Sequence, residues 1–211
     1  MFYRPEDGHG LKHNPFNALV MPRPIGWISS CDKLGNVNLA PYSFFNAIAY
    51  TPPQVMFSAT AGHEQGGYKD SLANIKETGE FVCNLVSYEM REQMNKSSVP
   101  APHGTNELEL AGLESLPSSI VAPPRVAGCP GHLECTLSQI VELESGDADI
   151  PATMVIGKVV GIHIDDAKIV DGIVDMSAMN MIARLGYRGY CRVNDLFDMH
   201  RPPWPMDGNP E

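Results

Sequence analysis

The sequence contains six segments with the composition of β-strands, and these segments do not alternate regularly with helices. Each is short, rich in β-branched or aromatic residues, and bounded by turn-forming residues. The six segments cover 25–30, 38–46, 52–59, 80–87, 132–140 and 153–164. Helical patterns are fewer and cover 70–79, 87–98 and 105–114. Because a doubly wound parallel sheet needs helices between its strands, we predict a small antiparallel barrel with helical excursions.

The chain length indicates a single domain spanning 1–211. With 43% hydrophobic residues, a chain of 211 residues can bury a full core. We expect extended segments at the two ends, about 1–18 and 199–211, because the C-terminal one is rich in proline and both lack a periodic apolar pattern. The segment 117–131, rich in proline and glycine, indicates a long surface connection.

The charge balance limits the classes of partner. Lys and Arg number 15 and Asp and Glu number 25, which gives a formal net charge of −10. An acidic chain lacks the basic surface that phosphate backbones need, so we predict no nucleic-acid partner. The N-terminus is too polar for a signal peptide, and no apolar run approaches the roughly 20 residues of a membrane helix. We therefore expect a cytoplasmic protein without a membrane partner.

The cysteines indicate neither disulfides nor a metal site. Five cysteines at irregular spacing do not form a disulfide framework. Cys129, His132 and Cys135 recur at three-residue intervals, but a zinc site usually needs a fourth ligand and CxxC pairs. We predict no metal, with Cys135 packed inside a strand and His132 facing outward.

The segment GGYKDS, 66–71, has the features of a phosphate-binding helix start. Lys69 brings a positive charge, Ser71 brings a hydroxyl, and the first N–H groups of the following helix lack intrahelical acceptors. Asp70 would repel a phosphate, so we expect its side chain to cap the helix. The alternative is an ordinary capped helix start with a solvated lysine. Tyr68 and Asp70 interrupt the order of a P-loop, and no GxGxxG follows a strand.

The strand 153–164 carries a second candidate. Alternation places five residues on one face: Val155, Gly157, Val159, Gly161 and His163. Glycine inside a strand often marks a barrel corner or the close approach of a ligand. His163 is either a ligand-binding group or a hydrogen-bonded interior or edge histidine.

Two further segments carry aromatic and basic residues. Trp27 and Ser29 share one face of the strand 25–30, which suits an aromatic cofactor and equally suits a core. In RLGYRGY, 184–190, arginines alternate with tyrosines and glycines. No hydrolase motif of the GxSxG or HExxH type is present, so a bound cofactor is expected to supply any difficult chemistry.

Taken in order, these motifs resemble the flavin reductase-like family, the FMN-binding split barrels. The similarity runs from about Leu19 to about Pro202 and rests on RPIGWISSCDKLGNVNLAPYSFFNAIAYTPPQVMFSA, KDSLANIKETGEFVCNLV, VIGKVVGIHIDD and ARLGYRGYCRVNDLFDMHRP. It implies a six-stranded antiparallel split β-barrel with Greek-key topology, in a homodimer that binds FMN near its interface. In RLGYRGY the chain departs from the family, whose members often have Gly-Gly-x-Tyr after Arg-Leu.

The resemblance also implies roles for individual residues. Those that would frame the FMN phosphate are Lys69, Asp70 and Ser71. Those that would line the flavin are Trp27, Ile28 and Ser29 on one strand, Ser43, Phe44, Phe45 and Asn46 on the next, and Ser58 and Ala59 on a third. His163 and Arg184 would lie near the nicotinamide or come from the second subunit. Pro41 would break the strand ladder so that the backbone turns toward the flavin ring.

The activity that the resemblance implies is NAD(P)H:flavin oxidoreduction, with hydride passing from NADH or NADPH to flavin N5. Electrons would continue to free flavin, a partner monooxygenase or another acceptor. The first alternative is an FMN-containing electron carrier, similar to flavoredoxin, without its own nicotinamide site. The second is a barrel that binds no flavin and serves structure or assembly.

Overall fold

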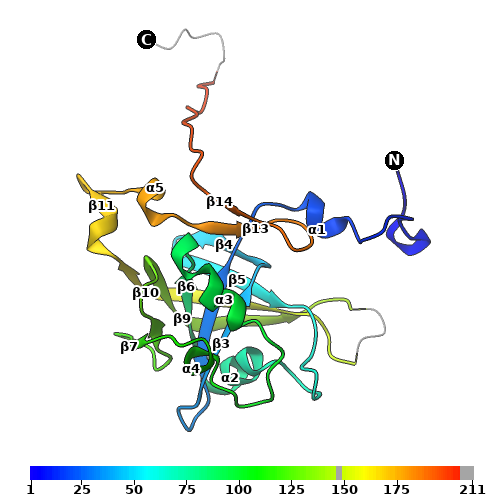
Figure 1. The fold of residues 1–211 in the computed structure, drawn as a ribbon, viewed down its shortest axis with the longest axis horizontal. Coiled ribbons are helices and arrows are strands. Elements are labelled where there is room, and N and C mark those ends of the chain that lie inside the picture. Colours follow the sequence, from blue (N-terminus) through cyan, green and yellow to red (C-terminus); the bar gives the residue numbers. More distant parts are fainter. Residues whose placement is uncertain (146–148, 205–211) are drawn as a thin grey trace.

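A computed structural model describes residues 1–145 and 149–204, and Figure 1 shows its fold. Within these residues, seven antiparallel strands form the main sheet. Their order is β3 (Val37–Tyr42), β2 (Gly26–Cys31), β6 (Glu80–Leu85), β9 (Gly131–Glu142), β10 (Thr153–Ile164), β5 (Pro53–Ala59) and β4 (Phe45–Tyr50). The predicted mainly β fold is confirmed. The predicted six-stranded closed barrel is not, because β3 and β4 remain as two free edges in the described part of the chain.

The seventh strand arises because the segment 38–46 contributes to two strands. β3 ends at Tyr42, a bend follows at Ser43 and Phe44, and β4 begins at Phe45. Pro41 lies inside β3 opposite Trp27, and β3 is an edge strand, where a missing N–H group can face away from the ladder. The prediction that Pro41 turns the chain is therefore wrong, and the turn comes two residues later.

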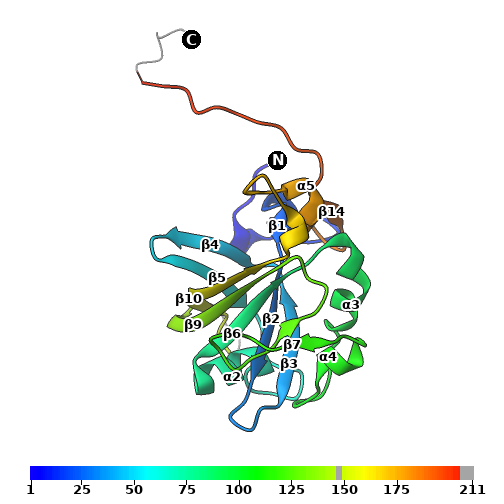
Figure 2. The same cartoon turned by 90° about the vertical axis from the view of Figure 1, so that its left-hand side faces the viewer.

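The main sheet separates two hydrophobic clusters. One contains Ile28 and Phe81 and is covered by Leu72 and Ile75 of α2 (Asp70–Thr78). The other contains Trp27 together with side chains of α3 (Arg91–Lys96) and α4 (Glu107–Leu110). Neighbouring residues of β2 thus enter opposite clusters, as strand alternation predicts. Figure 2 shows α3 and α4 beside the end of the sheet formed by β2 and β3.

The helices follow the predicted segments in shortened form. α2 fills 70–78 and ends at Gly79, whose φ of 75° is the left-handed conformation typical of a helix C-cap. The segment 87–98 forms a 3₁₀ turn, Tyr88–Met90, followed by α3, and Ser87 makes no capping bond with its side chain. In 105–114 only α4 forms, and the side chain of Asn106 caps it.

The remaining elements lie around the main sheet. A three-stranded sheet is formed by β1 (Arg23–Pro24), β13 (Ile182–Arg184) and β14 (Tyr190–Arg192), close to α1 (Phe16–Leu19). The short pairs are β7 (Ser115–Leu116) with β8 (Arg125–Val126) and β11 (Ile169–Val170) with β12 (Ile173–Val174). The other helical pieces are α5 (Met176–Met179) and the 3₁₀ turns Pro5–Asp7 and Asp166–Lys168.

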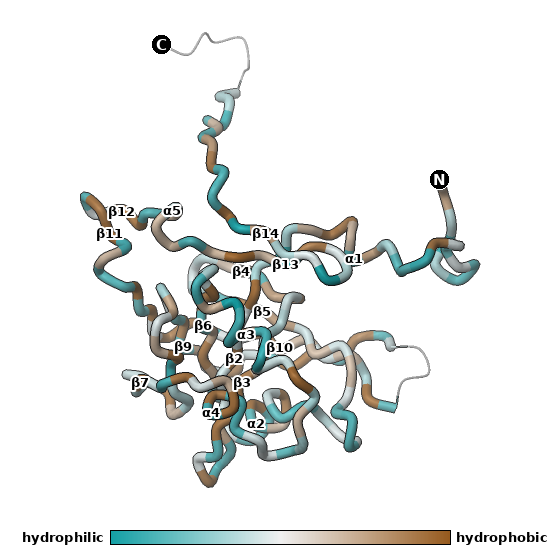
Figure 3. The backbone as a smooth tube through the Cα atoms, viewed as in Figure 1, coloured by the Kyte–Doolittle hydropathy of each residue, from teal (hydrophilic) through white to brown (hydrophobic). Residues whose placement is uncertain are grey.

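The predicted extended N-terminal segment, 1–18, contains a 3₁₀ turn at Pro5–Asp7 and the start of α1. The C-terminal segment leaves the body after β14 and carries no helix or strand as far as residue 204; the predicted tail residues 205–211 lie outside the described residues. Hydrophobic residues concentrate in the central strands, and hydrophilic residues prevail in α3 (Figure 3). None of the helices in 1–145 and 149–204 is long and apolar enough to cross a membrane.

A β-bulge in β10 reverses the faces of that strand. In the pairing with β9, Val159 lies opposite Cys135 and Gly161 opposite Glu134, so that Val160 is skipped. Val155 and Val159 enter the cluster of Ile28 and Phe81, whereas His163 contacts Glu134 on the other face. The prediction that all five residues share one face is therefore wrong beyond Val159.

Three further predictions concern single positions. Gly157 was expected at a barrel corner or beside a ligand, but a Cβ there would lie 2.3 Å from Cζ of Phe81, so a core ring makes the close approach. Cys135 is buried, as predicted. His132, predicted to face outward, is only 4% exposed and its Nδ1 lies 2.9 Å from Oδ1 of Asn84.

Candidate functional site

Three pockets that share lining residues form a groove. The first pocket has a volume of about 170 Å³ and reaches the start of α2. The second, of about 130 Å³, shares Pro41 and Ser98 with the first. The third, of about 350 Å³, shares Met94, Asn95 and Tyr190 with the second. Together they match the size of a ligand site, typically about 300–1,000 Å³.

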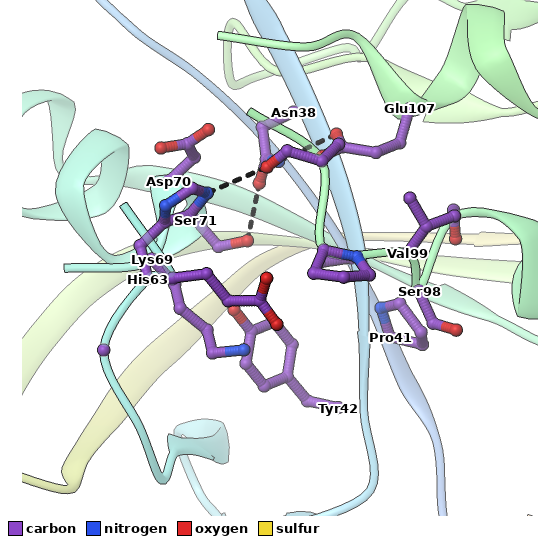
Figure 4. A pocket seen from close by; sticks show the side chains of 16 residues that line it. Asn38, Pro41, Tyr42, His63, Lys69, Asp70, Ser71, Ser98, Val99 and Glu107 are labelled. Atoms are coloured by element: carbon purple, nitrogen blue, oxygen red, sulfur yellow. Dashed lines mark hydrogen bonds between the residues drawn. The ribbon is translucent and has the colours of Figure 1, made fainter. Parts of the chain in front are cut away.

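The first pocket contains the predicted helix start. Lys69 precedes α2 and lines the pocket, together with Asp70 and Ser71 (Figure 4). The first helical hydrogen bond of α2 runs from the N–H of Ala73 to the carbonyl of Lys69, at 3.0 Å. The N–H groups before Ala73 therefore have no acceptor within the helix, which favours binding of an anion.

Asp70 has a different role from the predicted one. Its side chain does not cap α2. Instead its carboxylate hydrogen-bonds Nδ1 of His103 and accepts the N–H of Gly104 at 3.1 Å. The acidic group that would repel a phosphate is thus turned to a neighbouring loop and paired there.

A chain of buried polar groups forms one wall of the first pocket. The Ser71 hydroxyl donates to Oδ1 of Asn38 at 2.6 Å, and Nδ2 of Asn38 donates to Glu107 at 2.8 Å. The same carboxylate accepts the N–H of Leu39 at 2.9 Å. Burial raises the pKa of Glu107. Because the Ser71 hydroxyl already donates its proton to Asn38, Ser71 can bind an anion only through its backbone N–H.

Tyr42 supplies a hydroxyl without a partner. Its Oη is buried and makes no hydrogen bond within the described residues, although Tyr42 lines the first pocket. Burial raises the pKa of Tyr42 to about 12, so the hydroxyl keeps its proton. A buried donor without an acceptor is costly, and a polar ligand in the pocket would remove that cost.

The second pocket joins two predicted residues from distant parts of the sequence. Ser43 follows β3, and Arg184 ends β13. The Arg184 guanidinium hydrogen-bonds the hydroxyl of Tyr190 and donates to the carbonyl of Tyr187 at 2.5 Å. Its central carbon also lies 4.6 Å from the centre of the Tyr190 ring. The basic side chain is therefore fixed beside the second pocket by Tyr190, which also lines the third pocket.

The predicted residues of β2 lie behind the groove. Trp27, Ile28 and Ser29 are fully buried and line none of the three pockets. The Trp27 indole N–H donates to the hydroxyl of Ser97 at 2.8 Å, and Ser97 lines the first pocket. Trp27 thus supports a wall of the groove from inside the core.

The predicted residues of β4 and β5, and Phe44 just before β4, are also outside the groove. Phe44 lies beneath the guanidinium of Arg23, whose carbon is 5.5 Å from the ring centre. Phe45 and Ala59 are buried in the core. The two polar residues form local hydrogen bonds instead. The backbone N–H of Ser58 donates to the carbonyl of Phe44, and the side chain of Asn46 accepts the N–H of Ala47.

His163 lies in a separate place. Its Nε2 is 2.5 Å from Oε1 of Glu134, in a pocket that it shares with His132 and Arg125. None of these residues lines the groove. In this chain the structure does not bring His163 together with Lys69.

Sequence reasoning missed five residues near the first pocket: Asn38, Tyr42, His63, His103 and Glu107. Asn38 and Tyr42 lie in or beside the segment 38–46, so the surplus of polar groups there was a usable signal. His63, His103 and Glu107 come from loops and a short helix whose approach to α2 depends on the tertiary fold.

Comparison with known proteins identifies related chains. The flavin reductase like domain matches residues 18–177. An uncharacterized protein of Halalkalibacterium halodurans is 34% identical over 183 residues, which cover 87% of each chain. The crystal structure of nitrilotriacetate monooxygenase component B from Bacillus cereus has a TM-score of 0.82 at 27% identity and covers 91% of this chain and 100% of that one. Pseudomonas fluorescens 2-nitrobenzoate 2-nitroreductase has a TM-score of 0.77 at 29% identity, covering 91% of both chains.

Proposed function

Because the chain belongs to the flavin reductase-like family, we propose that it binds FMN in the groove and reduces it with NADH or NADPH. The observation that carries this proposal is the continuity of the groove. It joins the anion-binding start of α2 to Ser43 and Arg184 through the shared residues Pro41 and Ser98. A phosphate-bearing ligand with a long ring system needs such a combination of a polar end and an extended channel.

The residues present fit the polar groups of FMN. Lys69 and the first N–H groups of α2 would hold the phosphate. The hydroxyl of Tyr42, which has no hydrogen-bond partner in 1–145 and 149–204, would donate to a phosphate or ribityl oxygen. Pro41 and Ser98 lie where the first two pockets meet, and they would flank the part of the ligand that passes between them.

Bound FMN would supply a ring that accepts a hydride at N5, which no protein side chain can do. The protein would contribute binding and orientation. Arg184, fixed by Tyr190 and Tyr187, would set the position of an anionic group of the nucleotide at the second pocket. The reduced flavin would serve an acceptor such as free flavin, a small nitro compound or a partner monooxygenase.

We expect the protein to act as a homodimer. β4 is an edge strand, and five of its six residues are exposed. Ile48 and Tyr50 contribute large apolar side chains to this edge, and Tyr50 is 92% exposed. Such an edge favours pairing with another strand. Light scattering should give twice the monomer mass, and Ile48→Lys should shift the protein toward the monomer.

The activity is tested by anaerobic titration of the FMN-loaded protein with NADH and with NADPH. Loss of the visible flavin absorbance with either nucleotide is the expected result. If neither nucleotide bleaches a flavin that dithionite does bleach, the reductase function is excluded and the electron-carrier function takes its place. If the protein quenches no FMN fluorescence, flavin binding itself is excluded.

A further inference from the structure

Two loops beside the first pocket are joined by a pair of histidines. His63 lies in the loop between β5 and α2, and His103 lies in the loop before α4. Their rings stack with centres 3.6 Å apart and an angle of 22° between planes. His63 lines the pocket directly, and His103 contacts it through Asp70.

The hydrogen bonds around His103 define its protonation state. Its Nδ1 faces the Asp70 carboxylate, and its Nε2 lies 3.0 Å from the carbonyl oxygen of Gly66. Both partners are acceptors only, so both ring nitrogens must carry a proton, and the ring is an imidazolium. The bond to Asp70, followed by the bond to Gly66, raises the pKa of His103 in agreement with this geometry.

The hydrogen bonds around His63 require the opposite state. The N–H of Gln65 donates to Nδ1 of His63 at 3.0 Å. Its Nε2 lies 2.9 Å from the carbonyl oxygen of Ala101 and must donate. His63 therefore fills all its bonds as a neutral ring. A neutral ring stacked on a cationic one is a favourable pair, whereas two cationic rings would repel.

The charges around the first pocket explain why a second cation matters. Three carboxylates line it, those of Glu64, Asp70 and Glu107, against the single ammonium of Lys69 among the described lining residues. A phosphate would be repelled by this excess of negative charge. The imidazolium of His103 offsets Asp70, the carboxylate nearest the start of α2, and the N–H of Gly104 adds a further donor.

We propose that His103 is a positioning residue for the phosphate: as an imidazolium it neutralises Asp70 and joins the two loops around the first pocket. This inference rests on the proposed binding of FMN. It adds the requirement that His103 carries a positive charge, which the start of α2 alone does not predict. Phosphate affinity should fall when His103 loses its proton, because Asp70 then regains its full negative charge toward the pocket.

The same side chains do not form a good metal site. The ligand atoms of His63, Asp70 and His103 lie within 4.8 Å of one another. However, hydrogen bonds already occupy all four ring nitrogens. Stacked rings also direct their nitrogens within parallel planes, whereas a metal ion needs ligands that converge on one point.

The protonation state is tested first on the protein without added flavin. Nitrogen NMR of imidazole-labelled protein, assigned by His103→Gln, should show both nitrogens of His103 protonated at pH 7 and a titration above the ordinary range of histidine. A neutral His103 at pH 7 would overturn the proposal. So would a titration that changes when EDTA removes bound metal.

The effect on binding is tested with FMN and riboflavin from about pH 7 upward through the His103 titration that NMR measures, where the phosphate stays doubly charged. FMN affinity of the wild type should fall roughly threefold to fivefold across the His103 titration, as expected for a partly exposed charge. Riboflavin affinity should stay constant. His103→Gln should bind FMN weakly at every pH, and Asp70→Asn in the same chain should restore the affinity. His200→Gln, on the extended tail, serves as the matched control.

The outcomes separate this proposal from the function on which it rests. Equal FMN affinity and equal pH profiles in wild type and His103→Gln would overturn the role of His103 and leave FMN binding intact. Parallel losses of FMN and riboflavin affinity would also overturn it, since they indicate that His103 acts only by holding the loops and not by neutralising Asp70. If the wild type binds neither compound, the proposed function fails, while the NMR titration still decides the charge of His103.

Discussion

Lys69 is the residue on which the proposed phosphate site depends most. It combines an ammonium with a position immediately before α2, and no ion pair of its side chain occurs within the described residues. We predict that Lys69→Ala weakens FMN binding by roughly tenfold to a hundredfold, the usual effect of losing one charge-assisted hydrogen bond. Fluorescence quenching measures the affinity.

The control for this prediction is Lys158→Ala, which removes an exposed lysine from β10. It should leave FMN affinity unchanged, and riboflavin affinity should be similar in all three proteins. Unchanged FMN affinity in Lys69→Ala would remove Lys69 from the phosphate site.

Substitution of Gly157 tests the packing of the core, because alanine adds a single Cβ atom there. A Cβ at this position would lie 2.3 Å from Cζ of Phe81, and both residues are inside the main sheet. We predict that Gly157→Ala lowers the free energy of unfolding by roughly 1–3 kcal/mol, the usual cost of overpacking. Urea denaturation measures this change, with Lys158→Ala as the exposed neighbour. Equal stability of both variants would contradict the close approach.

At the scale of elements, Glu134 of β9 holds the long connection 117–131 against the sheet. Its carboxylate accepts the N–H groups of Ser119, Ile120 and Val121 at 2.7, 2.7 and 3.1 Å. Glu134→Gln loses the charge that these donors stabilise, and we predict a loss of roughly 1.5–3 kcal/mol in the free energy of unfolding. Hydrogen exchange at the three N–H groups should accelerate.

The matched control is Glu142→Gln, at the exposed end of the same strand. This variant should keep both the stability and the exchange rates of the wild type. Slow exchange at residues 119–121 in Glu134→Gln would show that other contacts hold the connection.

The elements were predicted well where the pattern is local and poorly where it depends on pairing. The strand 153–164 has the expected length, but the sequence does not mark the bulge at Val160, which depends on the register with β9. Similarly, Pro41 fits inside β3 because β3 has a neighbouring strand on one side only among the residues that the structure describes, which local sequence cannot reveal. The role of Asp70 could not be predicted from local sequence either, because its hydrogen-bond partner His103 is 33 residues away.

At the scale of the whole molecule, two buried groups govern stability in acid. Burial lowers the pKa of His132 to about 4, helped by Arg125 and His163. For Glu134, burial acts to raise the pKa, but the donors from Ser119 and His163 and the neighbouring N–H groups lower it to about 2. Both groups bind protons more readily in the unfolded chain, whose pKa values are about 6.5 and 4.3. Acid therefore favours unfolding.

We predict that the free energy of unfolding falls as the pH drops from about 6.5 toward 2. The decrease from His132 should occur between about pH 6.5 and 4, and that from Glu134 between about pH 4.3 and 2. Urea denaturation at a series of pH values measures the effect, and His132→Gln should lose the first part of it. A constant free energy of unfolding between pH 7 and 4 would contradict the neutral state of His132.

The sequence motifs predicted part of the fold and part of the groove. The order of segments predicted the mainly β class, and the predicted phosphate-binding helix start at Lys69 lines the first pocket of the groove. The other lining residues come from β3, β13 and the loops around α3 and α4, which meet only after the sheet has formed. Trp27 and His163 were plausible from their residue types, yet burial and the β10 bulge place them away from the groove.

We propose that FMN lies in the groove from Lys69 through Pro41 and Ser98 to Arg184. A crystal structure of the protein soaked with FMN tests it most directly. We predict that the phosphate lies within hydrogen-bond distance of the Lys69 ammonium and the first N–H groups of α2, and that the rest of the molecule extends past Pro41 toward Arg184. Flavin density elsewhere on the protein, or phosphate density away from α2, would contradict the claim.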